Sequence, residues 1–223
     1  MLAAIAGGIV WGLFNGFCVT KLRVPALITT LGTLGAALGV ANLITNGNDI
    51  TVSQKAMIKL QISDELGFPW IVWLALVVVL IGGAVLRYTR FGRRTYVIGS
   101  NDEAARRAGV NVNAHLVKLY AISGGLAGLA GMMSLVRFST TTIGGHSQDA
   151  LTVITGVILG GTSLYGGYGV VLGTVIGIFI PTVLQNGLVV QNVQPFWQNV
   201  AVGFILIGAV YLDQLKRSAR DRS

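Results

Sequence analysis

The feature that most constrains this chain is a run of 63 consecutive residues, from 150 to 212, that contains no Asp, Glu, Lys or Arg. A typical soluble domain carries about 25% charged residues, so an uncharged run of this length does not suit a water-soluble fold. A helix that crosses the bilayer takes about 20 apolar residues, which gives the run room for roughly three crossings. We therefore predict an all-α, polytopic transmembrane helix bundle.

The composition of the whole chain agrees with this class. Charged residues make up 11% of the 223 residues, hydrophobic residues make up 53%, and the mean hydropathy is +0.72. The net charge of +8 does not indicate nucleic-acid binding, because the basic residues stand at the ends of apolar runs. A nucleic-acid interface needs them spread over one water-facing surface. Cys18 is the single cysteine and lies within an apolar run, so we expect it to pack as a small hydrophobic residue.

Further uncharged runs bring the predicted number of crossings to about seven, since one crossing takes about 20 residues. Polar and glycine-rich breaks at 162–169 and 191–195 divide the long run into three. We predict that the short segment 150–163 is a half-helix or is shielded by protein instead of lipid. The predicted crossings are 1–20, 24–48, 66–86, 119–136, 150–163, 169–190 and 196–212.

The distribution of Lys and Arg predicts the orientation, because cytoplasmic loops are enriched in these residues. A cytoplasmic loop at 88–118 places 13 of the 16 basic residues inside, together with a cytoplasmic C-terminus. Only Lys55, Lys59 and Arg137 then lie outside. We therefore expect a single transmembrane domain over 1–215, with this loop in the cytoplasm, and a basic cytoplasmic tail over 216–223.

This orientation puts the N-terminus outside the cell. The apolar segment that follows Met1 then runs inward, with no basic region before it and no visible cleavage site. We expect that the chain lacks an N-terminal part with an odd number of crossings. A short protein with an outside N-terminus is the alternative.

Glycine recurs every fourth residue in several predicted crossings. Helices in lipid associate through close backbone approach at such small-residue faces, because lipid offers no hydrophobic drive between them. We predict a tightly packed bundle that uses these faces: Gly8, Gly12 and Gly16; Gly35 and Gly39; Gly124 and Gly128; and Gly169, Gly173 and Gly177.

Several kinds of chemistry are missing from the sequence. No predicted crossing carries an ionisable residue near its middle, which disfavours a carrier coupled to protons or sodium. No Lys follows a Gly, which excludes the phosphate-binding loop G-x-x-x-x-G-K-[ST]. We predict that the chain is not an enzyme and takes no cofactor or metal. Any ATP that drives it would be hydrolysed by another subunit.

One short helix is predicted within the basic loop. Ser100 and Glu103 have the spacing of a capping box, and Gly109 suits the left-handed turn that ends a helix. Ala104 and Ala108 would form one small face that can fit a groove. The predicted coupling helix, with acids in its first turn and arginines in its last, is Asn101, Asp102, Glu103, Ala104, Ala105, Arg106, Arg107, Ala108 and Gly109.

The pattern Glu103-Ala104-Ala105, followed by three residues and Gly109, resembles the EAA loop of ATP-binding-cassette importers. The surrounding sequence resembles more specifically the permease subunits of the ribose/xylose/arabinose/autoinducer-2 class of bacterial ABC importers. The segments that carry this resemblance are 24–33, 89–99, 101–110, 123–131, 159–167 and 186–188.

The resemblance implies a ten-crossing protein with both termini in the cytoplasm, so that three crossings would precede this chain. It implies the transmembrane subunit of an ATP-driven importer for a monosaccharide or similar small polar solute in the bacterial inner membrane. The implied partners are a cytoplasmic ATP-binding-cassette ATPase, a periplasmic sugar-binding protein, a second permease subunit in a homo- or heterodimer, and the lipid bilayer, with no nucleic acid. The chain departs from the class at Leu119, where an I-x-L-P sequence is missing, and at Ala150-Leu151-Thr152, where many relatives have an acidic residue.

Uncharged hydrogen-bonding residues within the crossings are candidates for the translocation path. Each of them also suits a purely structural role, because Ser and Thr in membrane helices often bond their own backbone. These candidates are Thr29, Thr33, Asn42, Thr155, Thr162, Ser163 and Asn186.

Two other functions stay open at this point. A channel or facilitator would pass solute without nucleotide and would leave the coupling helix without a partner. A non-transporting, truncated membrane protein is the third possibility, because a bundle without about a third of its packing lacks helix contacts that hold it closed.

Overall fold

The computed structural model describes residues 2–52, 64–65, 68–141, 143–146, 149–164 and 166–220. In this part of the chain, five helices are long and apolar enough to cross a membrane. They are α1 (Leu2–Thr20), α2 (Ala26–Thr45), α4 (Trp70–Tyr88), α7 (Val112–Phe138) and α9 (Val171–Val190).

The remaining elements are shorter or only partly apolar. α8 (Asp149–Leu159) and the Phe196–Tyr211 part of α10 (Pro195–Arg220) are the shorter apolar helices. α5 (Arg90–Ser100) and α6 (Asp102–Arg107) follow α4, and β1 (Asp64–Glu65) pairs antiparallel with β2 (Phe68–Pro69).

Every predicted crossing contains one apolar helix, which confirms the all-α membrane bundle. The number of crossings and the orientation stay predictions. α8 has 11 residues, and at 1.5 Å per residue it spans about 16 Å of a hydrocarbon core about 30 Å thick. This length supports the half-helix predicted for 150–163. α10 continues as a helix to Arg220, through most of the predicted tail.

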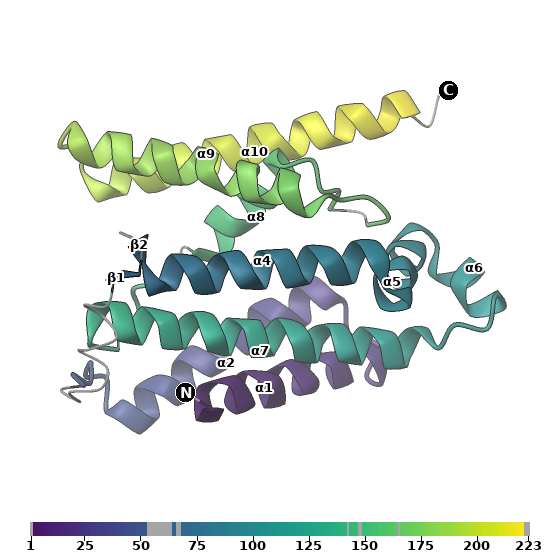
Figure 1. Cartoon of the computed structure of the whole chain (residues 1–223), viewed down its shortest axis with the longest axis horizontal. Helices are drawn as coiled ribbons and strands as arrows, with labels where there is room; N and C mark the ends of the chain where they lie inside the picture. The colour runs from purple at the N-terminus through teal and green to yellow at the C-terminus, as the bar shows by residue number, and fades with distance from the viewer. Residues whose placement is uncertain are drawn as a thin grey trace. The chain divides into compact units, whose positions relative to one another are not determined.

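The chain forms two compact units, of which the first comprises residues 1–78 and 109–144. Within it, α1 packs lengthwise along α7, and α2 contacts α1 (Figure 1). A methyl group added at Gly8 or Gly12 would collide with the backbone carbonyl oxygen of Gly124 or Tyr120. The predicted glycine contacts are therefore confirmed for α1 and α7.

The loops at one end of this unit are joined by backbone hydrogen bonds. The amide of Val52 donates to the carbonyl of Ser139 at 2.9 Å, and the amide of Thr141 donates to the carbonyl of Ile50 at 3.0 Å. The loop after α2 and the loop after α7 therefore lie at the same end of the unit.

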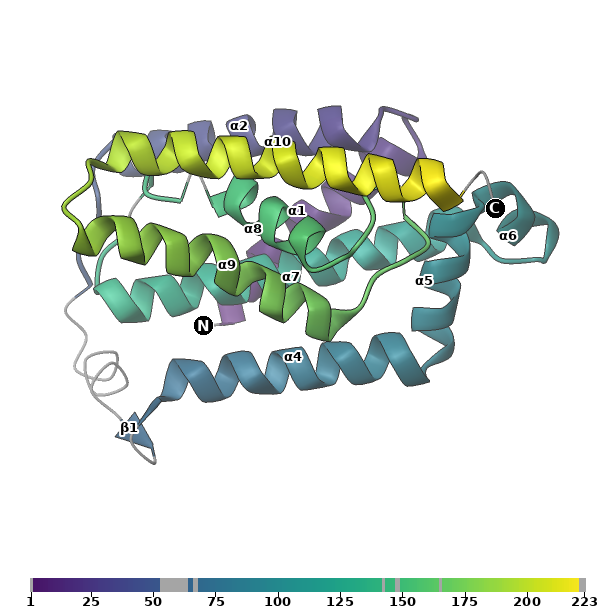
Figure 2. The same ribbon diagram turned by 90° about the horizontal axis from the view of Figure 1, so that it is seen from above.

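The second unit comprises residues 79–108 and 145–223. Within it, α8 packs on α9, and α10 contacts both helices (Figure 2). A methyl group at Gly156 would lie 2.7 Å from the Cα of Ile178, and one at Gly177 would collide with the backbone of Gly156. The predicted packing role is confirmed for Gly173 and Gly177.

Two other glycine predictions are not met. Gly169 precedes α9 and faces Thr162 instead of a neighbouring helix. No atom of the described chain lies within 4 Å of a methyl group built at Gly35 or Gly39. The four-residue spacing on α2 is thus not used for packing within this chain, because only a few residues of α2 reach α1.

Candidate functional site

The helices α5 and α6 form an arm at the end of α4 (Figure 2), and we call residues 89–109 the coupling arm. The arm begins at Thr89, whose side-chain oxygen accepts a hydrogen bond from the amide of Gly92 at 3.2 Å. This bond satisfies one of the free amides in the first turn of α5. The chain therefore leaves the apolar α4 and starts a separate, polar helix.

The capping box of Ser100 and Glu103 predicted at the start of α6 is wrong, and the Glu103 carboxylate pairs with Arg107 instead. Ser100 is the last residue of α5, and Asn101 caps α6 by accepting a hydrogen bond from the amide of Ala104 at 2.9 Å. Asn101 has an extended backbone, with φ −158° and ψ 103°, as an N-cap residue requires. Gly109, after the helix, has φ +80°, the left-handed conformation predicted for it.

The charges of α6 pair along the helix. Arg106 lies 3.7 Å from Asp102, and Arg107 lies 2.5 Å from Glu103, both at the i, i+4 spacing. All four side chains are at least half exposed, so water screens these pairs and each contributes about 0.5 kcal/mol or less. They orient the side chains and leave them accessible to a partner.

The small residues of α6 divide between two faces. Ala105 is completely buried, whereas Ala104 and Ala108 are exposed. The exposed pair is the small face that the sequence predicts to fit a groove. No partner chain is needed to bury Ala105, because it is already buried within this chain.

Of the three candidate path residues on α2, Thr33 contacts α1. Thr29 and Thr33 are buried, and the Thr33 hydroxyl donates to the side-chain oxygen of Asn15 at 2.7 Å. The Thr29 hydroxyl oxygen is enclosed and has no hydrogen-bond partner among the described residues. Asn15 was not among the sequence candidates, although it is an amide in the middle of an uncharged run. Asn42, further along α2, is exposed and donates to the carbonyl of its own helix at Leu38.

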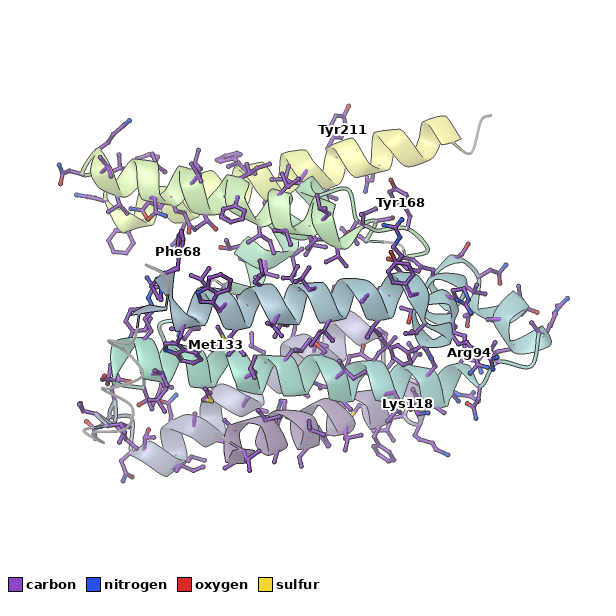
Figure 3. The ribbon with its side chains drawn as sticks, viewed as in Figure 1. Phe68, Arg94, Lys118, Met133, Tyr168 and Tyr211 are labelled. Carbon is purple, nitrogen blue, oxygen red and sulfur yellow. The ribbon has the colours of Figure 1, made fainter. Side chains whose placement is uncertain are left out.

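In the second unit, the candidate path residues lie in three places: in α8, in α9 and in the turn between these helices. Thr155 is completely buried in α8, and its hydroxyl donates to the carbonyl of Leu151 at 2.7 Å. Asn186 is exposed near the end of α9. Thr162 and Ser163 lie in the turn between α8 and α9, where Tyr168 is labelled in Figure 3.

This turn is unusual in its backbone. Gly161, Gly166 and Gly167 have φ values of +84°, +89° and +76°, which residues with a side chain rarely adopt. The hydroxyls of Thr162 and Thr174 lie 3.1 Å apart and join the turn to α9. The turn therefore has a defined shape that depends on its glycines.

A groove of about 360 Å³ in the first unit does not suit a polar solute. It is apolar, and it is lined by Ile5, Ile9, Val78, Ala121, Ile122, Gly125, Leu126 and Leu129. Among the described residues, no three His, Cys, Asp or Glu side chains come close enough together to hold a metal ion. The polar candidates therefore lie outside the groove, in helix contacts and in the α8–α9 turn.

The apolar helices define a polytopic membrane protein. The chain belongs to the family described as branched-chain amino acid transport system / permease component, whose profile matches residues 1–210. Together with the five apolar helices, the family identifies a multi-pass inner-membrane protein.

Curated relatives match along almost the whole chain. The L-arabinose transport system permease protein AraH of Escherichia coli is 37% identical over 210 residues, which are 92% of this chain and 63% of the relative. The autoinducer 2 import system permease protein LsrC of Salmonella typhimurium is 34% identical over 224 residues, 100% of this chain and 64% of the relative. LsrC of Photorhabdus laumondii is 33% identical over 97% of this chain and 65% of its own length.

The chain thus spans slightly less than two thirds of the length of these relatives. No solved structure matches it.

Proposed function

We propose that this chain is a transmembrane subunit of an ATP-driven importer for a monosaccharide or a similar small polar solute. The observation that carries the proposal is the match, at 33–37% identity, to permease proteins of arabinose and autoinducer 2 import systems. The exposed, capped helix α6 supports it, because an importer without its own nucleotide site needs a surface on which an ATPase can act.

The proposed assembly contains a cytoplasmic ATP-binding-cassette ATPase, a periplasmic sugar-binding protein and a second permease subunit. The ATPase would hydrolyse ATP, so that this chain itself performs no catalysis. Its exposed residues Glu103, Ala104 and Ala108 would fit a groove of the ATPase, with Gly109 as the end of the helix. Closure of the ATPase dimer would then move the coupling arm and rock the helices between outward-open and inward-open states.

The solute path would use uncharged hydrogen-bonding groups. The enclosed Thr29 hydroxyl, which has no partner among the described residues, and the Thr33–Asn15 pair offer such groups within the predicted crossings. Neutral hydroxyl and amide groups bind a polyol without the cost of placing a charge in the membrane.

Reconstitution in proteoliposomes tests the proposal. The chain is purified from its native membrane with the ATPase that accompanies it, and uptake of labelled L-arabinose, D-ribose and autoinducer 2 is measured with sugar-loaded binding protein. L-leucine serves as the control solute. We expect uptake of one of the first three that requires ATP and stops with an ATPase variant that binds nucleotide without hydrolysing it.

The other outcomes contradict the proposal in different ways. Uptake without nucleotide would identify a channel or facilitator. A chain that retains no ATPase and moves none of these solutes would be a non-transporting membrane protein. Uptake of leucine alone would overturn the substrate class.

A further inference from the structure

Helix α5 has two different faces. Arg90, Arg93 and Arg94 are exposed along one side, and Arg94 is labelled in Figure 3. At 3.6 residues per turn, Gly99 lies on the opposite side, with Tyr96 at its edge. That side meets the turn between α8 and α9, which we call the glycine turn (residues 162–164 and 166–170). Both elements belong to the second unit.

The contact between α5 and the glycine turn is a backbone contact. A methyl group at Gly99 would lie 2.6 Å from the amide nitrogen of Gly167, and one at Gly166 would lie 2.6 Å from the carbonyl oxygen of Gly99. A methyl group at Gly167 would lie 2.9 Å from the Cα of Ser100. The two segments therefore touch at three positions where no side chain fits without a shift.

A side-chain hydrogen bond fixes the same contact. The Tyr96 hydroxyl donates to the carbonyl of Gly169 at 2.8 Å, and Tyr96 is half-buried. Gly169 in turn lies against Thr162, since a methyl group there would be 2.8 Å from the Thr162 Cγ2. Thr162 reaches Thr174 on α9. A continuous series of contacts thus runs from α5 through the turn to α9.

We infer that Tyr96 and Gly99 are positioning residues that join the coupling arm to the α8–α9 pair, so that these elements move as one rigid body. The arm is thereby connected to the turn that carries Thr162 and Ser163, in addition to its covalent connection to α4. The consequence for transport rests on the proposed function, whereas the rigid connection itself does not.

Distances between two spin labels test the connection directly. The labels are placed on Arg94→Cys and Leu172→Cys in a Cys18→Ala background, because both positions are exposed and lie on opposite sides of the contact. The purified chain is measured in lipid nanodiscs. We expect one narrow distance population, and we expect Gly99→Ala to produce a second, longer one.

Tyr96→Phe is the conservative variant, because it removes only the hydroxyl. Loss of one neutral hydrogen bond is expected to lower the ratio of joined to separated conformers about fivefold. Tyr88→Phe makes the same chemical change on a side chain that is 70% exposed, and it should leave the distances unchanged. A broad distribution in the unmodified chain, or the same narrow one in both Tyr96→Phe and Gly99→Ala, would overturn the connection.

The reconstituted importer provides the second measurement. Tyr96→Phe should lower the amount of solute transported per ATP hydrolysed, while basal ATPase activity and binding of the ATPase stay as they are. If a variant shows the longer label distance and yet transports as much solute per ATP as the unmodified chain, the proposed role of the contact in coupling is wrong. If the unmodified chain transports nothing, the proposed function fails, and the label distances still decide whether the arm and the turn are one body.

Discussion

Single polar residues determine how α1 meets α2. The Asn15 amide lies within an apolar helix, where an unsatisfied polar group is costly, and it accepts the hydrogen of the Thr33 hydroxyl at 2.7 Å. The Thr33 hydroxyl also lies 3.2 Å from the Thr30 carbonyl, whereas the hydroxyls of Thr30 and Thr45 bond carbonyls of their own helix alone. Thr33 is therefore a position at which a hydroxyl joins two helices of the first unit.

Removal of this interhelical bond should destabilise the first unit modestly. Hydrogen bonds between membrane helices contribute about 0.6 kcal/mol on average, so we expect a loss of that size for Asn15→Ala and for Thr33→Val. A double-mutant cycle measured by reversible unfolding in bicelles isolates the pair. Thr45→Val, which removes a hydroxyl bonded within its own helix, is the control. Fully additive losses would show that the two side chains do not interact.

Substitutions of Asn101 and of its neighbour Ser100 test separately which residue caps α6. Asn101→Ala should cost about 1 kcal/mol of helix stability, because it removes the acceptor for the amide of Ala104. α6 has only six residues, so this loss frays the whole helix, which is far shorter than the roughly 12 residues an isolated helix needs. Hydrogen exchange at Ala104 should accelerate in Asn101→Ala and stay unchanged in Ser100→Ala. Faster exchange in Ser100→Ala and unchanged exchange in Asn101→Ala would identify Ser100 as the N-cap residue of α6.

At the scale of elements, glycine distinguishes the helices that pack within this chain from those that do not. α1 approaches α7 so closely that the Cβ positions of Gly8 and Gly12 are occupied by backbone, and α8 meets α9 in the same way. α2 carries the same spacing at Gly35 and Gly39 but faces open space there. The spacing alone is thus insufficient to identify a packed face.

Alanine substitutions at Gly12 on α1 and Gly35 on α2 should distinguish a packed glycine from an unpacked one. Gly12→Ala places a methyl group on the carbonyl of Tyr120, and forcing extra volume into a packed contact costs about 1–3 kcal/mol. Gly35→Ala meets no atom within 4 Å, and it should be neutral or stabilise the helix by up to about 1 kcal/mol. The midpoint of thermal unfolding in detergent measures both. Equal losses would show that α2 packs as closely as α1.

The sequence was sufficient to predict the apolar helices and several of the glycines that pack, but not which segments meet. Uncharged runs determine where apolar helices lie, since the bilayer requires about 20 apolar residues for each crossing. The motif around Glu103 located α6, although its cap was assigned to the wrong residue, and helix α5 was not predicted. The contact of Gly99 with Gly166 could not be predicted, because residues 67 positions apart in the sequence meet only through the fold. Asn15 could have been noticed as an amide in an apolar run, but its partner depends on the packing of α2.

For the whole molecule, contacts within each unit support the predicted topology. In the first unit, the loops at 50–52 and 139–141 are hydrogen-bonded to each other, and both are predicted to lie outside. In the second unit, α5 touches the glycine turn, and both are predicted to lie inside. Seven crossings would produce these pairs of neighbours in either orientation, so the orientation itself stays a prediction.

Labelling of single cysteines in intact cells tests this topology. In a Cys18→Ala background, a membrane-impermeant maleimide should label Asn48→Cys and Gln191→Cys from outside, because these positions follow α2 and α9 on the side with few basic residues. It should reach Arg94→Cys only after the membrane is permeabilised. Labelling of Arg94→Cys in intact cells would show that the orientation is the reverse of the predicted one. Protection of Gln191→Cys alongside labelling of Asn48→Cys would show that α8 and α9 together do not make the two crossings, and that the short α8 enters and leaves the membrane on one side.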